Sequence, residues 1–410
     1  MKRALSFLTI FTMIFMATGC VEDDPIQPGP PPYPPTGSNP PVNSNVINKN
    51  INSKTVLKNH QSGVDYEICG TVYVNAELII EAGTEIVMCS GARLYVEKDG
   101  SLNAIGTEAS PIVIRGKAAS PGYWDLIRIS ANNPSNVMEY VTLSDGGGYN
   151  YYSNTTVHVN KGNSGQLTMK NSKIKNSKGY GLTVEGGATI PNFSNNTFSN
   201  NGDAPVQIAF SILGALDDSS NFSDGNANNY IDVKASTINQ AQEVKSLDVP
   251  YLLNGTNYIK NGLKLEAGVE ILMAAGTRVY VESSGSFNAI GTNAKPIEIK
   301  GKVNTHGYWD LIRFESNNPL NEFKYVNIQD GGAYSYYYYS SIYVSKSNNA
   351  SFIMNDCNIS DSYGWGLYAD KGASMTPSTE AAVRSANTFN NNGNGVNASC
   401  TGSCDVYVGQ

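Results

Sequence analysis

The chain of 410 residues is poor in charged side chains, in histidine and in long apolar runs. Charged residues make up 15% of it, and the net charge is −7. A nucleic-acid-binding protein needs a basic patch or stripe, so this balance argues against a nucleic acid as partner. We find no stretch of ten or more residues with the apolar period of a helix, and no cysteine and histidine set with the spacing of a zinc site. The sequence therefore predicts neither a helical protein nor a metal or cofactor site.

Glycine and tyrosine are the abundant residues. The chain holds 40 glycines, and its 25 tyrosines outnumber its 12 phenylalanines. Glycine, like the frequent asparagine, belongs to turns, and tyrosine combines an apolar ring with a hydroxyl that needs a polar partner. Together they predict an all-β protein with many turns and a large surface.

The first residues have the pattern of a targeting segment. Two basic residues precede an apolar run at 4–16, which is too short for a membrane-spanning helix. The run is followed by "ATGC", and small residues before a cysteine resemble the lipobox of bacterial lipoproteins. The resemblance implies a signal peptide at 1–19 and a lipid on Cys20, although Ala17 stands where leucine is commonest. An ordinary secretory signal is the alternative.

The segment behind the cysteine is acidic and then rich in proline. The "VEDD" after Cys20 resembles the surface-export signal of Bacteroidota lipoproteins, and an ordinary solvated charge run is the alternative. Residues 25–41 hold nine of the 18 prolines, a composition that favours extended polyproline II and a spacer of ~50 Å. We therefore expect a lipidated linker at 20–44 and a location on the outer membrane, facing the cell exterior.

The rest of the chain repeats itself. Residues 81–107 return at 266–292 with 18 of 27 positions identical, an offset of 185. "GYWDLIR" and "DGG" recur at the same offset, and the second copy gains about six residues before "NTF". The repeat predicts two duplicated units, residues 45–230 and 231–410.

Within each unit, apolar residues alternate in short runs that are separated by glycine-containing turns. Alternation with period two predicts β-strands, and short strands with tight turns predict a solenoid. The pattern from Leu94 to Ile114, and again from Val279 to Ile299, resembles the repeat of bacterial right-handed parallel β-helix proteins. The resemblance implies that fold and leaves the activity open. A series of β-sandwiches is the alternative. Asparagines at 171–177 and again at 195–201 predict a stacked asparagine ladder.

The cysteines offer a check on the coil length. Cys69 and Cys89 are separated by close to one coil, and both are absent from the second unit, which predicts a disulfide between neighbouring coils. Cys400 and Cys404 could form a second bridge that holds the last coil, and Cys357 is expected to be a small buried side chain.

Parallel β-helices include polysaccharide lyases and glycoside hydrolases, so catalysis has to be considered. The carboxylate candidates are those of "GYWDLIR", Asp125 and Asp310 with the arginines three residues on, and the aspartates of the "DGG" turns. All of them occur in both units, which favours a scaffold or a binding role over a catalytic site. His158 alternates with two valines and is expected to face outward without an acid or base partner. The tryptophans of "GYW", Trp124 and Trp309, are expected to be buried anchors.

The tyrosine-rich segments 145–159 and 330–344 are the candidate binding surfaces. One interpretation is ring stacking between coils, which needs no ligand. The other is a platform for sugar rings on the outer wall, at two places that one long polysaccharide could bridge. The residues of the platform would be Tyr149, Tyr151, Tyr152, Asp330, Tyr334, Tyr336, Tyr337 and Tyr338.

From these observations we expect a non-catalytic, lipid-anchored surface protein that binds a polysaccharide or a surface protein through its tyrosine patches. A polysaccharide-degrading enzyme and a purely structural or adhesive rod are the alternatives.

Overall fold

The computed structural model describes residues 45–61, 63–393 and 404–409. The chain divides into two compact units, 1–42 and 43–410, and only the second falls within the described residues. The signal peptide, Cys20 and the proline-rich linker therefore lie outside the described residues. In the described part, no helix is long and apolar enough to cross a membrane.

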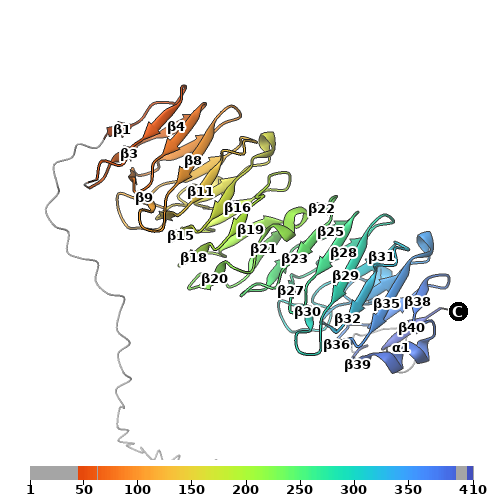
Figure 1. Ribbon diagram of the computed structural model, residues 1–410. Coiled ribbons are helices and arrows are strands. Elements are labelled where there is room, and N and C mark those ends of the chain that lie inside the picture. The colour runs from red at the N-terminus through yellow and green to blue at the C-terminus, as the bar shows by residue number, and fades with distance from the viewer. Residues whose placement is uncertain (1–44, 62, 394–403, 410) are drawn as a thin grey trace, which may run out of the picture. The chain divides into compact units, whose positions relative to one another are not determined.

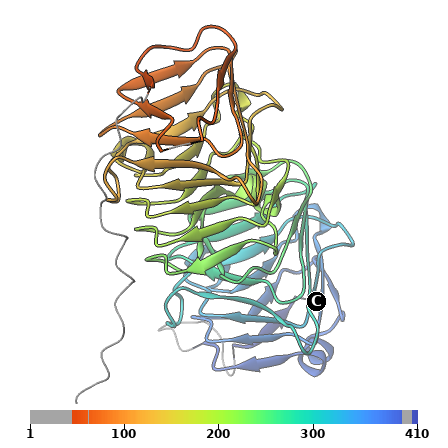
Figure 2. The same ribbon diagram turned by 60° about the vertical axis from the view of Figure 1, so that its left-hand side comes forward.

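The described part of the second unit is an all-β solenoid of parallel strands, with consecutive coils side by side (Figures 1 and 2). One sheet, here called the continuous sheet, runs through all of it. Its thirteen strands are β4 (Thr71–Val74), β7 (Arg93–Val96), β10 (Leu126–Ile129), β13 (Val157–Val159), β16 (Leu182–Val184), β19 (Val206–Ala209), β21 (Ile231–Lys234), β24 (Tyr251–Leu253), β27 (Glu270–Met273), β30 (Ile297–Gly301), β33 (Val326–Gln329), β36 (Asn358–Ser360) and β39 (Thr388–Asn390).

Two further sheets lie within residues 45–230, here called the first half of the solenoid, and residues 231–410 are called the second half. The eight-stranded sheet holds β1 (Asn45–Ile47), β3 (Tyr66–Ile68), β6 (Glu85–Met88), β9 (Ile112–Gly116), β12 (Val141–Ser144), β15 (Lys173–Lys175), β18 (Thr197–Ser199) and β20 (Asn221–Asp224). A six-stranded sheet holds β2 (Thr55–Leu57), β5 (Glu77–Ile80), β8 (Ser101–Ile105), β11 (Val137–Glu139), β14 (Thr168–Lys170) and β17 (Phe193–Ser194).

The second half has two sheets of its own. The seven-stranded sheet holds β22 (Thr237–Ile238), β25 (Thr256–Ile259), β28 (Arg278–Val281), β31 (Leu311–Phe314), β34 (Ile342–Val344), β37 (Leu367–Ala369) and β40 (Val406–Val408). Another six-stranded sheet holds β23 (Gln242–Val244), β26 (Gly262–Leu265), β29 (Ser286–Ile290), β32 (Glu322–Lys324), β35 (Ser351–Asn355) and β38 (Ser374–Thr376). The helices are short: η1 (Asn150–Tyr152), η2 (Gly162–Ser164), η3 (Phe210–Ala215), η4 (Ser335–Tyr337), η5 (Ser347–Asn349) and α1 (Glu380–Ala386).

Strands at equivalent positions of the two sequence copies have matching bounds but lie in different sheets. β7 belongs to the continuous sheet, whereas its counterpart β28 belongs to the seven-stranded sheet. Likewise β9 belongs to the eight-stranded sheet and its counterpart β30 to the continuous sheet. The 3-10 helix η3 stands between β19 and β20, where earlier coils place a strand of the six-stranded sheet. The offset between the two copies is thus not a whole number of coils. Each strand of the second copy lies one face further around the solenoid than its counterpart in the first copy.

The core lies inside the coils. Along each strand, every second side chain points into it. In the continuous sheet Leu94, Ile127 and Val157 are partners in register, and all are buried. Phe193, Phe198 and Phe222 stack within 6–13° of parallel in the first half. Full burial of each such side chain contributes ~1.5–3 kcal/mol, so the stack is stabilised chiefly by apolar burial along its whole length.

Asparagine side chains connect neighbouring coils, as the sequence predicted. The amide of Asn201 donates to Asn226 Oδ1 over 2.8 Å, and the Asn201 Oδ1 accepts from the backbone N–H of Ser177 over 3.1 Å. Other asparagines of the same segments take left-handed backbone angles, among them Asn171 and Asn195 with φ of 49° and 54°. Asparagine tolerates this region better than most residues, so these side chains serve the turns as well as the ladder.

The two tryptophans are buried anchors, as expected. Trp124 and Trp309 are 0% exposed, and their indole N–H groups donate to the carbonyl oxygens of Ser144 (2.7 Å) and Gln329 (2.6 Å). A Cβ atom on the first glycine of either "DGG" turn would come within 3 Å of the indole ring. The close approach explains why each tryptophan is accompanied by a glycine turn.

The cysteine predictions are confirmed where they can be compared with the structure. Cys69 and Cys89 form a disulfide. Cys357 is a buried thiol in the apolar core, and burial raises its pKa to about 12. Cys400 lies outside the described residues, and Cys404 is buried.

One helix was not expected. The residues that the second copy gains before "NTF" form α1, whose first turn is capped by Thr379 Oγ1 accepting from the backbone N–H of Ala382. A helix as short as this one does not produce a helical period in the sequence.

Candidate binding groove

The tyrosine-rich segments are turns at the corners of the solenoid. η1 connects β12 of the eight-stranded sheet to β13 of the continuous sheet. η4 connects β33 of the continuous sheet to β34 of the seven-stranded sheet. Because the second half is advanced by one face, the two turns lie at different corners. A polysaccharide that contacts both turns, as the sequence suggested, would therefore have to cross from one corner to the next.

In the first turn, two of the three tyrosines are held by arginines. The guanidinium of Arg93 lies 3.9 Å from the centre of the Tyr149 ring, and Arg128 donates to the Tyr152 hydroxyl over 2.9 Å. Tyr151 packs its ring edge-on against Tyr152 and is 75% exposed. The turn thus fixes two rings and presents the third to solvent.

The second turn repeats this arrangement. Arg278 lies 3.8 Å from the centre of the Tyr334 ring, and Arg313 lies 4.7 Å from that of Tyr337. Tyr336 is 75% exposed, like Tyr151. Tyr338 follows with a left-handed φ of 57°, where the first turn has Ser153.

Asp330 is separated from this tyrosine surface by burial. Its side chain is 2% exposed, and burial raises the pKa of its carboxyl group. Its counterpart Asp145 is also buried and accepts hydrogen bonds from Ser144 Oγ, the Gly116 N–H and Asn176 Nδ2. Both aspartates stand at the "DGG" turns with a positive φ, as turn residues do.

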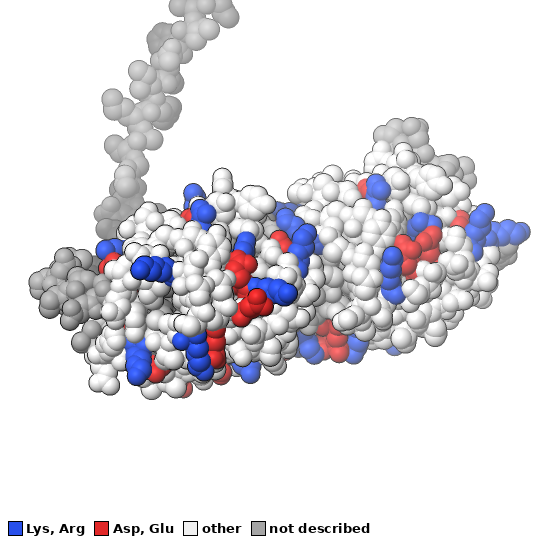
Figure 3. Space-filling view, turned by 90° about the horizontal axis from the view of Figure 1, so that it is seen from above, with Lys and Arg blue, Asp and Glu red and all other residues white. Residues whose placement is uncertain are grey.

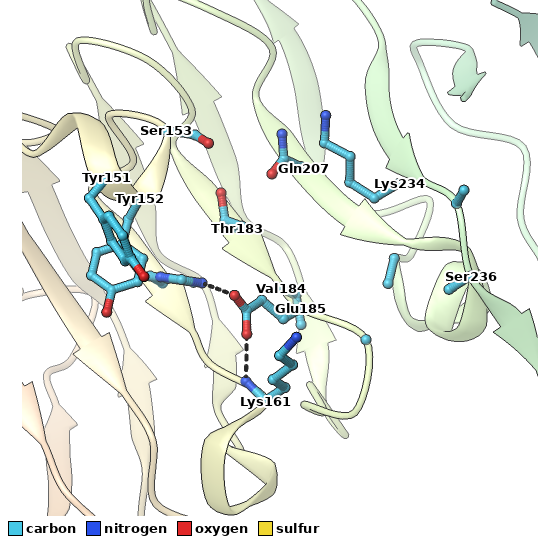
Figure 4. Close-up of a pocket in the computed structure, with 14 residues that line it drawn as sticks. Tyr151, Tyr152, Ser153, Lys161, Thr183, Val184, Glu185, Gln207, Lys234 and Ser236 are labelled. Atoms are coloured by element: carbon cyan, nitrogen blue, oxygen red, sulfur yellow. Dashed lines mark hydrogen bonds and ion pairs between the residues drawn. The ribbon is translucent and has the colours of Figure 1, made fainter. Parts of the chain in front are cut away.

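A groove opens beside the first turn, on the outer face of the continuous sheet. Its floor follows one row of side chains in register, His158, Thr183 and Gln207. Tyr151 and Tyr152 stand on one side of it and Lys234 and Ser236 on the other, as Figure 4 shows. The groove has a volume of about 380 Å³ and is lined by Tyr151, Tyr152, Ser153, His158, Lys161, Thr183, Val184, Glu185, Gly186, Gln207, Ala209, Lys234, Ala235 and Ser236.

His158 is covered rather than exposed, and it has an acidic neighbour that the sequence did not reveal. Its ring is 2% exposed and lies 4.6 Å from the Tyr152 ring. Its Nε2 is 3.4 Å from Glu185 Oε1, an ion pair when the ring is protonated. Burial, opposed by Glu185, lowers the pKa of His158 to about 4, so the ring is neutral at pH 7. The histidine does point to the outer face of the sheet, as expected, but the expectation that it lacks an acidic partner is wrong, because the partner lies one coil later.

Glu185 also has a structural task that recurs in the second half. Its Oε2 accepts from the backbone N–H of Lys161 over 2.9 Å. The counterpart Asp370 accepts from the backbone N–H of Lys346 over 3.1 Å and from the hydroxyl of Tyr343 over 2.6 Å. The carboxylate therefore holds the same turn in both halves, and the histidine of the first half is replaced by a tyrosine in the second.

The rest of the floor is polar and partly unpaired. Gln207 donates to Asp232, which also lies 3.2 Å from the ammonium group of Lys234. The hydroxyl of Thr183 and the Nδ1 atom of His158 are buried without a hydrogen-bond partner among the described residues. Buried polar groups are nearly always paired, so such groups at the floor of a groove indicate a place for a hydrogen-bonding ligand.

In the second half, tyrosines occupy the corresponding row. Tyr343, Tyr368 and Tyr407 are partners in register on the seven-stranded sheet. Tyr368 stacks on Tyr407 with ring centres 4.6 Å apart, and Tyr338 stacks on Tyr368 at 4.1 Å. The predicted stacking of tyrosines between coils is confirmed here. These rings fill the positions that His158 and Thr183 leave open in the first half.

The carboxylates of "GYWDLIR" do not pair with the arginines three residues on. Asp125 is bound by Arg93 and Asp310 by Arg278, each pair connecting neighbouring coils. Arg128 instead pairs with Glu97. The Arg93–Asp125 pair of the first half thus recurs as Arg278–Asp310 in the second half, next to the tyrosine turn in each case, which identifies it as a support for those turns.

Charges elsewhere on the surface are interspersed. On the face seen in Figure 3, lysines and arginines lie next to acidic side chains. Oppositely charged side chains of neighbouring coils form pairs on the surface, such as Arg115 with Glu85 and Lys300 with Glu270. Exposed pairs of this kind contribute little to stability, about 0–1 kcal/mol each.

The groove is suited to binding and lacks the pair of acids that hydrolysis needs. A glycosidase places two carboxyl groups about 5–10 Å apart across the scissile bond. Of the residues that line the groove, Glu185 alone carries a carboxylate, and it is engaged by a backbone N–H and by His158. An exposed ring, hydroxyls, an amide and two lysines can instead contact a hydroxyl-rich ligand.

No family model, no curated protein and no solved structure matches this chain.

Proposed function

We propose that this protein is a lipid-anchored protein of the outer cell surface that binds glycans without degrading them. Its solenoid is a right-handed β-helix of two duplicated units, preceded by a signal peptide and a proline-rich linker. The lipobox-like "ATGC" and the proline-rich segment support the anchoring, and the constant offset between the two sequence copies supports the duplication.

The observation that carries the glycan proposal is the groove beside η1. It combines an exposed tyrosine ring with a floor of unpaired polar atoms. Sugar rings present C–H groups on their faces and hydroxyls on their edges, so they are matched by an aromatic face together with hydrogen-bonding side chains. Tyr151 is the stacking ring, and Thr183 and Gln207 are the hydrogen-bonding floor.

The tyrosines of the second half have a different role in this proposal. Most of their faces are covered by neighbouring rings or by arginines, which favours a structural role. Tyr336 is the exception, since 75% of it is exposed. A purely structural or adhesive rod remains the alternative that this stack favours.

Affinity electrophoresis of the full-length protein tests the proposal. The gels contain neutral and acidic polysaccharides, and we expect retention that Tyr151→Ala reduces about tenfold or more, as for a central aromatic contact. Tyr336→Ala is the matched control, because its ring is equally exposed but borders the filled row. Equal loss in both variants, or no retention on any polysaccharide, would reject the groove as the glycan site.

The anchor is tested separately. We expect Cys20→Ala to abolish acylation and to release the protein from the membrane fraction. A membrane-bound, acylated Cys20→Ala protein would contradict the anchor.

A further inference from the structure

The charged groups in and around the groove differ in whether they can still contact a ligand. Glu185 is fully used, because Oε1 faces His158 and Oε2 accepts from the Lys161 N–H and from Asn160 Nδ2. Asp232, the next residue of the same row after Gln207, accepts hydrogen bonds from Gln207, Asn254 and the hydroxyl of Tyr180 and so has little capacity left for a ligand. The acidic groups near the groove are thus engaged by the protein itself.

The ammonium groups are less engaged. Lys161 lines the groove and has no ion-pair partner among the residues that the structure describes. Lys234, on the opposite wall, lies 3.2 Å from Asp232 Oδ2, an oxygen that it shares with Gln207 and with the hydroxyl of Tyr180. Both lysines therefore retain donors for a ligand, one on each side of the floor.

From this imbalance we infer that the groove takes an acidic saccharide, whose sugar carboxylates accept hydrogen bonds from Lys161 and Lys234. The inference rests on the proposed glycan binding and specifies its substrate class. The sum of nearby charges is close to neutral, so long-range attraction is small and is screened by salt within ~10 Å. Preference for an acid arises from contact, because charge-assisted hydrogen bonds are about twice as strong as neutral ones.

The neutral floor fits the same ligand. Lys161 follows β13 and Lys234 ends β21, three strands along the continuous sheet, or about 14 Å at the strand spacing. They would therefore bind carboxylates of different sugar residues, and ring hydroxyls between these would lie over Thr183, a buried residue whose own hydroxyl is unpaired. Tyr151 then covers one sugar face. The ligand would be a chain of uronate residues that contacts the ring of Tyr151, the hydroxyl of Thr183 and the ammonium groups of the two lysines.

The probe is polygalacturonate, with its fully methyl-esterified form as the matched neutral polymer. Both have the same sugar backbone, and only the ester lacks the charge. Dextran sulfate and dextran form a second pair, which distinguishes a sulfate ester from a carboxylate as the source of the negative charge. We expect the full-length protein to be retained by polygalacturonate at least about tenfold more strongly than by the ester, the effect of one charge-assisted hydrogen bond.

Two variants assign the effect to the lysines. We expect Lys161→Met and Lys234→Met together to reduce retention by polygalacturonate about tenfold and to leave retention by the ester unchanged. Lys346→Met is the control, because Lys346 occupies the position of Lys161 in the second half and borders the tyrosine stack. It is expected to behave like the unaltered protein.

The possible results separate the two proposals. Equal retention by the acid and the ester, with Tyr151→Ala still weakening both, rejects the acidic saccharide and leaves the glycan proposal standing. The assignment to the groove is also rejected if the double lysine variant still prefers the acid over the ester, or if Lys346→Met removes this preference equally. Stronger retention by dextran sulfate than by polygalacturonate rejects the carboxylate as the recognised group. Absence of retention by all four polymers rejects both proposals.

Discussion

The two halves of the solenoid use one framework for two different outer surfaces. Each has a buried tryptophan, an arginine lying on a tyrosine and one tyrosine that is 75% exposed. Beyond this turn they diverge, since His158 and Thr183 leave a groove where Tyr343 and Tyr368 form a stack. Repetition of the framework does not imply repetition of a site, because two side chains in one row decide whether the surface is open or filled.

The carboxylate next to this row shows how the change was accommodated. Glu185 and Asp370 both hold a backbone N–H of the preceding coil's turn. The shorter aspartate leaves room for the larger tyrosine ring, whose hydroxyl reaches it at 2.6 Å. Glutamate reaches further and meets the smaller imidazole at 3.4 Å. The smaller ring of the first half is thus paired with the longer carboxylate side chain, and the larger ring of the second half with the shorter one.

The largest effect is expected from the framework that both halves share. Trp124→Ala or Trp309→Ala removes a fully buried ring and an indole hydrogen bond, and should lower the free energy of unfolding by ~3–5 kcal/mol. Urea denaturation of each variant measures this. Tyr336→Ala, which removes an exposed ring, should lie close to zero. Unequal losses for the two tryptophans would break the equivalence of the halves.

A smaller effect concerns the histidine that only the first half has. Its pKa in the folded state is about 4, below the ordinary value of 6.5, because the ring is buried. The unfolded chain therefore binds this proton more readily between pH 4 and 6.5. Stability should be fully present above pH 6.5 and should decline as the pH falls towards 4, by about 3 kcal/mol in the limit.

Denaturation curves at several pH values test this for the unaltered protein and for His158→Tyr, which carries the residue of the second half. We expect the variant to lose less stability over the same pH range, because tyrosine does not titrate there. Identical pH profiles would show that His158 is not buried in its neutral form.

The tyrosine stack is expected to contribute less than either. Tyr368→Thr introduces the residue of the first half and removes ring contacts with Tyr338, Tyr343 and Tyr407. At ~0.5–1.5 kcal/mol per pair, the loss should be about 2–3 kcal/mol. Thr183→Ala serves as the control in the other half and should cost under about 1 kcal/mol, since its hydroxyl has no partner among the described residues. A Tyr368→Thr protein as stable as the original would mean that the rings do not stack in solution.

The smallest change in free energy is expected in binding. Thr183→Tyr places a ring in the groove and should reduce polysaccharide retention at least about tenfold, or about 1.4 kcal/mol, while circular dichroism stays that of a β protein. Retention equal to that of the unaltered protein would place the ligand elsewhere. Tyr368→Thr gives the reverse comparison, since it opens the row in the second half.

Much of the fold could be predicted because its determinants are local or repeat at a fixed offset. Alternating apolar residues require a strand with one face inward, as Leu94 and Val96 show by their burial. The joint absence of Cys69 and Cys89 from the second copy indicated their bridge, which the structure contains. The asparagine ladder was predicted from two asparagine-rich segments spaced by about one coil, and the buried tryptophans from the recurrence of "GYW".

The candidate site could be predicted only in part. The tyrosine segments were recognised, and Tyr151 and Tyr152 do border the groove. The floor was missed because Thr183, Gln207 and Glu185 carry no motif in the sequence. Asp330 was included because it opens a turn near the tyrosines, but its burial separates it from their surface.

The sequence by itself determined the strands, the turns and the residues that face inward, because each of these depends on neighbours along the chain or on a constant repeat. Only the tertiary structure decided which side chains meet across coils. The coils differ in length along the row of side chains that leads to the groove. More residues separate Tyr95 from its partner Arg128 than separate Tyr73 from its partner Tyr95. Coils of unequal length have no fixed period in the sequence. The contact of His158 with Glu185 is therefore defined only when the strands hydrogen-bond in register. The same holds for the shift of the second half by one face of the solenoid.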